Sequence, residues 1–218
     1  MGATVGGAAG TFTAGGVYVV SGSLGDGQLA VEAPEDAKVQ IVLAGATIHN
    51  EDGPAVYVKQ ADKCFITLAD GTQNALTDGA EYVLEDGYDE PYATLFSRAD
   101  LTLNGTGALT VTSAYRHAVC SKDDLVLTGG TYVVNAVEDA LRGRPCVKIA
   151  DGDFTLIAGG DGIKSNKDTK ATQGFVSLDG GTFVIAAGDD GIPAQTPLPI
   201  AGGAISHAAV SAAPPPTP

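Results

Sequence analysis

The chain has 218 residues and a formal net charge of −14, because 26 acidic residues outweigh 12 lysines and arginines. Such an acidic chain argues against nucleic acid and anionic membrane as partners, since both attract basic surfaces. Hydrophobic residues make up 44% of the chain, and its 30 glycines are about twice the usual share. This composition predicts a packed, turn-rich domain. Apolar runs such as residues 17–20 are too short to insert into a membrane.

The three cysteines, Cys64, Cys120 and Cys146, cannot all pair within the chain. No CxxC motif or Cys/His cluster indicates a zinc site. We therefore expect small apolar core residues at these positions, rather than a disulfide framework.

Short strands punctuated by Gly, Asp and Asn recur along the chain, and no helical periodicity of useful length is found. They alternate apolar with polar residues and are rich in β-branched and aromatic types. In chain order, we expect strands at residues 17–20, 28–31, 39–43, 55–58, 64–68, 101–103, 109–111, 125–127, 132–134, 147–149, 154–157, 175–178 and 183–185.

Two segments fall outside this pattern. Residues 78–91 contain five acids between Asp78 and Pro91 and are interpreted as an acidic loop inserted between repeats. Residues 211–218 are rich in Ala and Pro and are interpreted as a disordered tail or linker. Residues 1–210 then form a single domain.

An internal repeat decides the fold class. The unit that begins at Gly130 recurs 22 residues later at Gly152, then at Gly181 and Gly203. A unit of this length cannot bury its own apolar face and must stack on a neighbour. We therefore predict an all-β parallel β-helix with coils of about 22 residues. One inward ladder of the coils is expected to consist of Leu95, Val119, Leu141, Ile163 and Ile192.

Beside the apolar ladder, the repeat aligns a column of acids. Its acidic members and their preceding neighbours are Glu138, Asp139, Asp161, Asp189 and Asp190. Carboxylates stacked about 4.8 Å apart would repel by about 0.9 kcal/mol in water and roughly 3–4 kcal/mol at an effective dielectric constant of 20. A bound cation, a proton or a neighbouring basic column could offset this. Ca²⁺ fits because it prefers carboxylate oxygens, and Asp-Gly turns are the alternative explanation.

Basic residues form two further columns. Arg142 and Lys164 share one column, and Arg98, Lys122 and Arg144 share the other. Cations beside a calcium site would suit the carboxylates of an acidic sugar polymer. A solvated face whose cations balance the acids is the alternative.

The sequence offers little support for catalysis. The three histidines, His49, His117 and His207, lie in different repeats and have no nucleophile at a telling spacing. No glycine-rich phosphate loop opens a helix. We assign no catalytic residue.

Several motifs resemble one bacterial family of secreted or cell-surface proteins, namely calcium-binding, carbohydrate-binding β-helix proteins. The motifs are those at residues 53–59, 66–71, 76–79, 121–125 and 160–165. The similarity runs in order from about Gly10 to His207. The family's Asp-Gly-Ile pattern is present at residues 161–163 and 190–192, but Gly is replaced at Ala118 and Ala140.

The resemblance implies a right-handed parallel β-helix similar to pectate lyases, bound Ca²⁺ and affinity for acidic plant polysaccharide and cellulose. It favours the metal interpretation of the acidic column over turns alone. We therefore expect a non-catalytic, extracellular or cell-surface module that binds polysaccharides of the polygalacturonate type. No export signal opens this chain, and further domains of a larger surface protein are expected partners.

Two other functions stay open. One is a calcium-dependent polysaccharide lyase, with Lys164 or Arg142 as the base. The nearby carboxylates argue against that role because they favour the charged lysine. The other is a structural or adhesion module in which the repeats act as a rigid spacer.

Overall fold

The computed structural model describes residues 10–167, 170, 172–196 and 198–209. All regular structure in these ranges is β, and the strand pairings are parallel. None of it forms a helix long and apolar enough to cross a membrane. The boundary expected at residue 210 and the tail at 211–218 lie outside the described residues.

One sheet has seven strands and is formed by short segments from successive turns of the chain. In spatial order they are β1 (Gly10–Phe12), β3 (Leu29–Glu32), β5 (Val56–Gln60), β8 (Ala93–Ser97), β11 (His117–Ser121), β13 (Leu141–Gly143) and β15 (Ile163–Lys164). Each strand between the two end strands, β1 and β15, pairs with the corresponding strand of the turn before and after it.

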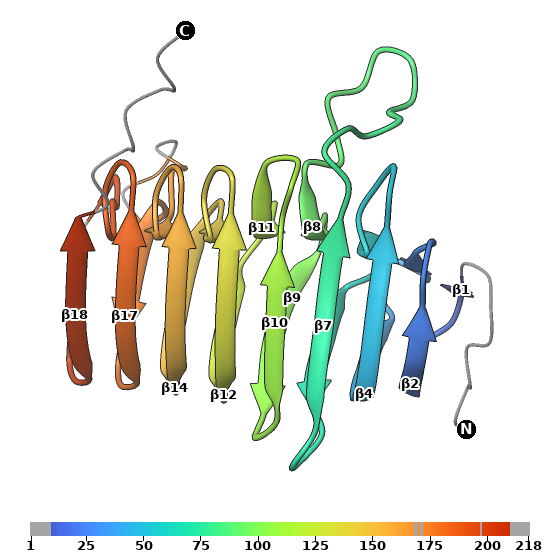
Figure 1. Cartoon of the computed structure of the whole chain (residues 1–218), viewed down its shortest axis with the longest axis horizontal. Coiled ribbons are helices and arrows are strands. Elements are labelled where there is room, and N and C mark those ends of the chain that lie inside the picture. Colours follow the sequence, from blue (N-terminus) through green and yellow to red (C-terminus); the bar gives the residue numbers. More distant parts are fainter. Residues whose placement is uncertain (1–9, 168–169, 171, 197, 210–218) are drawn as a thin grey trace, which may run out of the picture.

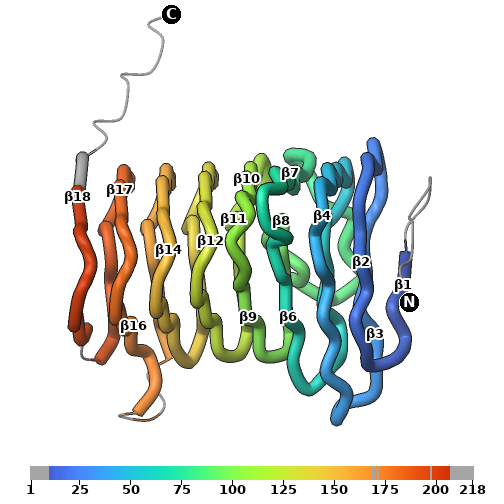
Figure 2. The backbone as a smooth tube through the Cα atoms, turned by 90° about the horizontal axis from the view of Figure 1, so that it is seen from below, coloured from blue at the N-terminus to red at the C-terminus, as the bar shows by residue number. Residues whose placement is uncertain are grey.

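The second sheet has eleven strands. They are β2 (Gly16–Leu24), β4 (Lys38–Asn50), β6 (Lys63–Leu68), β7 (Gln73–Asp78), β9 (Asp100–Gly105), β10 (Ala108–Thr112), β12 (Leu125–Ala136), β14 (Cys146–Ala158), β16 (Phe175–Leu178), β17 (Thr182–Ala187) and β18 (Ala204–Ala209). The chain passes from one sheet to the other and back, and the turns lie side by side from β2 to β18 (Figures 1 and 2).

The core lies between the sheets and consists of stacked ladders. Val119 pairs with Leu95 and with Leu141, and Leu141 pairs with Ile163, as the repeat predicts. The fifth predicted member, Ile192, packs against the core in a partly buried position. A second ladder stacks the rings of Tyr132, Phe154 and Phe183, with centres 5.0 and 4.9 Å apart and planes within 5°.

Two pairs of strands that were predicted separately are continuous. Residues 125–127 and 132–134 both belong to β12, and residues 147–149 and 154–157 both belong to β14. Gly130 and Gly152 lie in these strands with φ of 102° and 131°. A residue without Cβ adopts such angles easily. The strand therefore bends while its pairing continues on both sides of the bend.

Several strands were absent from the prediction. Gln73–Asp78 forms β7, although its polar composition is atypical of a strand. Strands β8, β11 and β13 were expected only as positions of the inward ladder. The predicted acidic loop is present, because residues 79–92 contain no strand and project from the stacked turns between β7 and β8 (Figure 1).

Candidate functional site

A column of three polar side chains runs along the seven-stranded sheet and consists of His117, Asp139 and Asp161. We call it the polar column, and each of its side chains accepts a hydrogen bond from the backbone of the next turn. The backbone N–H of Asp139 donates to Nδ1 of His117 at 3.1 Å. The N–H groups of Asp161 and Asp190 donate in the same way to Oδ1 of Asp139 and Asp161, at 3.1 and 2.9 Å. His117, Asp139 and Asp161 are buried. The column therefore has a structural role, because it satisfies backbone donors in successive turns.

Cations neutralise the buried carboxylates of this column. Nη1 of Arg142 lies 3.2 Å from Oδ2 of Asp139, and Nζ of Lys164 lies 2.5 Å from Oδ2 of Asp161. Burial lowers the pKa of Lys164, but the hydrogen bond to Asp161 and the charges of both aspartates outweigh it, so the pKa lies above its ordinary value. Repulsion between the stacked carboxylates could be offset by a bound cation, a proton or a basic column. The structure shows the basic column, because Arg142 and Lys164 pair with Asp139 and Asp161.

His117 sits among charged groups, yet it is neutral. Nη1 of Arg142 lies 2.8 Å from Nε2 of the ring, and Glu138 is bound to Nε of Arg116 at 3.1 Å. Burial is the largest effect on His117 and, together with the charge of Arg142, lowers its pKa to about 3. The ring is therefore uncharged at neutral pH.

The five predicted metal ligands do not share one environment. Asp139 and Asp161 are buried against cations, whereas Asp189 and Asp190 are exposed in the turn after the column. Glu138 is half-buried beside Arg116. The column thus brings Asp139 and Asp161 together, and its role as a metal site stays a prediction.

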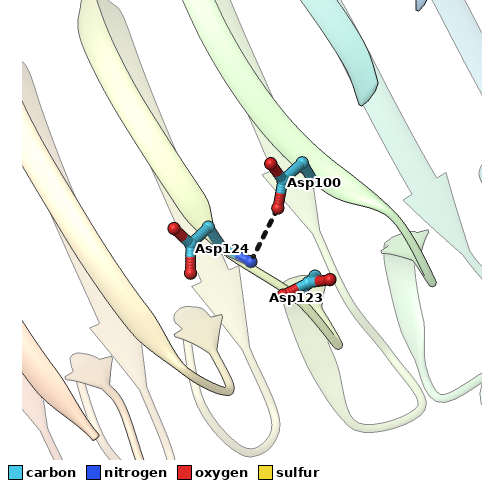
Figure 3. Close-up of side chains that lie close together, drawn as sticks. All are labelled: Asp100, Asp123 and Asp124. Atoms are coloured by element: carbon cyan, nitrogen blue, oxygen red, sulfur yellow. Dashed lines mark hydrogen bonds between the residues drawn. The ribbon is translucent and has the colours of Figure 1, made fainter. Parts of the chain in front are cut away.

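A second group of acidic residues lies where strands β9 and β12 of the eleven-stranded sheet begin. The sequence analysis did not predict it. Asp100 opens β9, and Asp123 and Asp124 precede β12 one turn later. Each offers a carboxylate oxygen within 4.8 Å of the others (Figure 3). Burial, followed by the charges of Asp123 and Asp124, raises the pKa of Asp100. We call this group the aspartate triad.

Two lysines lie at the edge of the triad, and their two positive charges are fewer than its three carboxylates. Nζ of Lys63 is 3.9 Å from Oδ2 of Asp100, and Nζ of Lys148 is 3.4 Å from Oδ2 of Asp124. Three carboxylates on a partly exposed corner are a donor set suited to a hard divalent cation. The 24-residue offset between Asp100 and Asp124 is the signal in the sequence that could have revealed the triad.

A row of cations follows the outer edge of the seven-stranded sheet. We call Lys59, Arg98, Lys122 and Arg144 the cation row. The backbone N–H groups of its last three members each donate to the preceding turn, at Val58, Ser97 and Ser121, with lengths of 2.9, 2.8 and 3.0 Å. These hydrogen bonds place the four residues at equivalent positions in four successive turns, about 4.8 Å apart.

The acidic loop supplies a carboxylate to the middle of the cation row. Oε2 of Glu90 accepts a 3.2 Å hydrogen bond from Nε of Arg98, and Oε1 contacts Nζ of Lys122. The Glu90 side chain is only 12% exposed. Arg144, in contrast, is exposed and makes no ion pair with any described residue.

A cleft of about 500 Å³ opens beside the row, between the loop and the N-terminal turns. Its walls include both acidic and basic groups as well as two tyrosines, among them Asn50, Asp52, Tyr57, Lys59, Tyr88 and Arg98. Nζ of Lys59 and the guanidinium carbon of Arg98 lie 5.5 and 5.6 Å from the ring centre of Tyr57. Tyr88 is 60% exposed. Lys59 and Arg98 thus belong both to the cation row and to the wall of the cleft.

Comparison with known proteins identifies a family and two similar proteins. A family model described as carbohydrate-binding domain-containing protein matches residues 6–214. A protein of that description from Acetivibrio thermocellus is 37% identical over 122 residues. The alignment covers 56% of this chain and only 43% of that relative.

A solved structure is similar over most of both chains. It is described as the polysaccharide lyase-like protein from C. thermocellum, in a gadolinium derivative. It superposes with a TM-score of 0.84 at 32% identity and covers 89% of each chain.

Proposed function

Because the chain belongs to the carbohydrate-binding domain family, we propose that it binds an acidic polysaccharide of the polygalacturonate type along the cation row. The carrying observation is the alignment of Lys59, Arg98, Lys122 and Arg144 in four successive turns beside an open cleft. A polymer with a carboxylate on each sugar unit matches a regular row of cations. The overall charge of −14 opposes such a ligand, so local cations must provide the attraction.

We extend the proposal to the architecture. The parallel strands and the repeated step between turns support a right-handed parallel β-helix, in which the two sheets form the faces of one coil. Because polysaccharides of this class lie outside cells, we also propose an extracellular or cell-surface location.

Titration with oligogalacturonate at low salt tests the binding proposal, with a cello-oligosaccharide as the neutral comparison. Arg144→Gln removes an exposed cation of the row that makes no ion pair with any described residue, and it should weaken binding several-fold. Lys38→Gln is the matched control, because Lys38 is an exposed cation on β4, outside the row. Equal binding by wild type and Arg144→Gln, or equal losses in both variants, would contradict the proposal.

We include Ca²⁺ in the proposal, and the aspartate triad is the group that fits it best. Its three carboxylates converge, whereas both oxygens of Asp139 already accept hydrogen bonds. When bound, the ion would supply positive charge that lessens repulsion of a polyanion. Calorimetry on chelator-stripped protein should show Ca²⁺ binding that Asp123→Asn weakens and Asp189→Asn leaves unchanged. The reverse pattern would move the ion to the polar column.

A calcium-dependent polysaccharide lyase is the second candidate function, and one observation favours it. Burial and the neighbouring charge of Arg144 lower the pKa of Lys122, whereas the carboxylate of Glu90 on its Nζ favours the charged form, so Lys122 would act as a base in the cation row only after Glu90 has left it. β-Elimination would transfer the proton next to the uronate carboxyl to that base and leave a double bond in the product. Growing ultraviolet absorbance from the unsaturated sugar during the titration would put the lyase first.

A further inference from the structure

Glu90 lies where a ligand carboxylate would lie if the proposed function is correct. Its two oxygens contact different cations, with Oε2 on Arg98 and Oε1 on Lys122. These cations belong to successive turns, so the carboxylate bridges two members of the cation row. A uronate on the row would present the same chemical group to the same donors.

The loop that carries Glu90 is anchored at its two ends. Near its start, the hydroxyl of Tyr82 donates to Oδ2 of buried Asp78 at 2.5 Å, and the Tyr82 ring stacks on Tyr115 with centres 4.3 Å apart. At its end, the ring of Tyr92 packs against Phe96 with centres 4.7 Å apart. The rings of Tyr82 and Tyr92 are thus held by the rings of Tyr115 and Phe96, not by the cations of the row.

The middle of the loop has few polar attachments. Among the described residues, Glu90 supplies the hydrogen bonds and ion pairs that join residues 84–91 to the rest of the protein. The hydrogen bond from the N–H of Tyr88 to Glu85 is internal to the loop. This segment could therefore leave the row without disturbing either anchor.

We propose that Arg98 and Lys122 form a carboxylate subsite which Glu90 occupies from within, and that an acidic polysaccharide displaces it. This inference rests on the proposed function and adds a regulation of the same site. The loop then acts as a strap that competes with the ligand. Apparent affinity is reduced by the fraction of molecules in which the strap is in place.

The test compares Glu90→Gln with Asp86→Asn in titrations with oligogalacturonate. Both variants remove one negative charge from the same loop, but Asp86 is exposed and makes no ion pair with any described residue. We expect Glu90→Gln to bind about fivefold more tightly than wild type and Asp86→Asn to bind almost as wild type does. Equal gains in both variants would mean a general charge effect and would overturn the strap.

Hydrogen exchange provides a second readout that charge alone does not change. Saturating oligogalacturonate should speed exchange at residues 84–90 in the wild type, because the strap leaves the row. Slower exchange there, or weaker binding by Glu90→Gln, would make Glu90 part of the ligand contact and overturn the inference. If wild type and Glu90→Gln both fail to bind oligogalacturonate, with and without Ca²⁺, the proposed function itself fails, and the strap with it.

Discussion

The backbone N–H of Asp161 donates a 3.1 Å hydrogen bond to Oδ1 of Asp139, which lies one turn earlier in the chain. The other carboxylate oxygen of Asp139 accepts from Arg142. A single buried side chain thus joins two turns and a cation. Its removal leaves a donor and a charge without their partner, which is more costly than the loss of an exposed pair.

We therefore predict that Asp139→Ala lowers the free energy of unfolding by about 3 kcal/mol. Asp189→Ala, at an exposed position next to the same column, should change it by less than about 0.5 kcal/mol. Denaturant unfolding measures both values. Similar losses in the two variants would show that the hydrogen-bonded column does not stabilise the turns.

Stability should fall as the pH falls because of His117. The unfolded chain protonates this residue near its ordinary pKa of about 6.5, whereas the pKa in the folded protein is about 3. Between these values the unfolded state binds more protons, so acid favours unfolding. This residue should account for a loss of about 2 kcal/mol between pH 7 and pH 5.

The measurement is denaturant unfolding of wild type and His117→Gln across this pH range. The variant lacks the titrating group, so its stability should depend less steeply on pH. Parallel curves for the two proteins would contradict a neutral, buried His117.

Two glycines with positive φ, Gly105 and Gly22, should differ in how well they tolerate substitution by alanine. A Cβ at Gly105 would lie 2.1 Å from the carbonyl oxygen of Leu68, whereas a Cβ at Gly22 would meet nothing within 4 Å. Both residues have positive φ, of 103° and 92°, so both alanine variants bear backbone strain of about 1 kcal/mol. Gly105→Ala should lose at least about 2 kcal/mol more in thermal or denaturant unfolding. Equal losses would mean that the backbone at Gly105 moves freely.

The anchor at the start of the loop should be measurable by itself. Tyr82→Phe removes the hydroxyl that donates to Asp78 and should cost about 1–2 kcal/mol. Proteolysis within residues 79–92 should become faster. Tyr88→Phe is the control, because Tyr88 is exposed and its hydroxyl has no described partner. An equal effect of the two variants would place the anchor elsewhere.

Much of the fold could be predicted from the sequence because the chain repeats a similar unit along its own length. The recurrence of the Gly130 unit predicts which residues stack, and the pairing of Val119 with Leu95 and Leu141 confirms it. When strands pair in parallel at a constant sequence step, the alignment of two repeats also predicts which residues pair in the other turns. Strand β7 was missed because its composition is polar, and only pairing with β4 and β10 makes it a strand.

The candidate site was less predictable because its contacts depend on where side chains reach. Alignment places Asp161 and Lys164 in neighbouring columns, but it does not reveal their 2.5 Å ion pair. The position of Glu90 on Arg98 and Lys122 depends on the path of a loop outside the repeat. The aspartate triad likewise forms across a corner between two turns.

The segment between β7 and β8 has a consequence for how such proteins can diversify. Inserting one residue within a strand would turn every later side chain of that strand to the opposite face. An insertion within residues 79–92 shifts no strand, because the loop leaves the stack after Asp78 and rejoins it at Ala93. The loop at this corner can therefore be lengthened, shortened or exchanged as one piece, while the ladders beneath it keep the same residues.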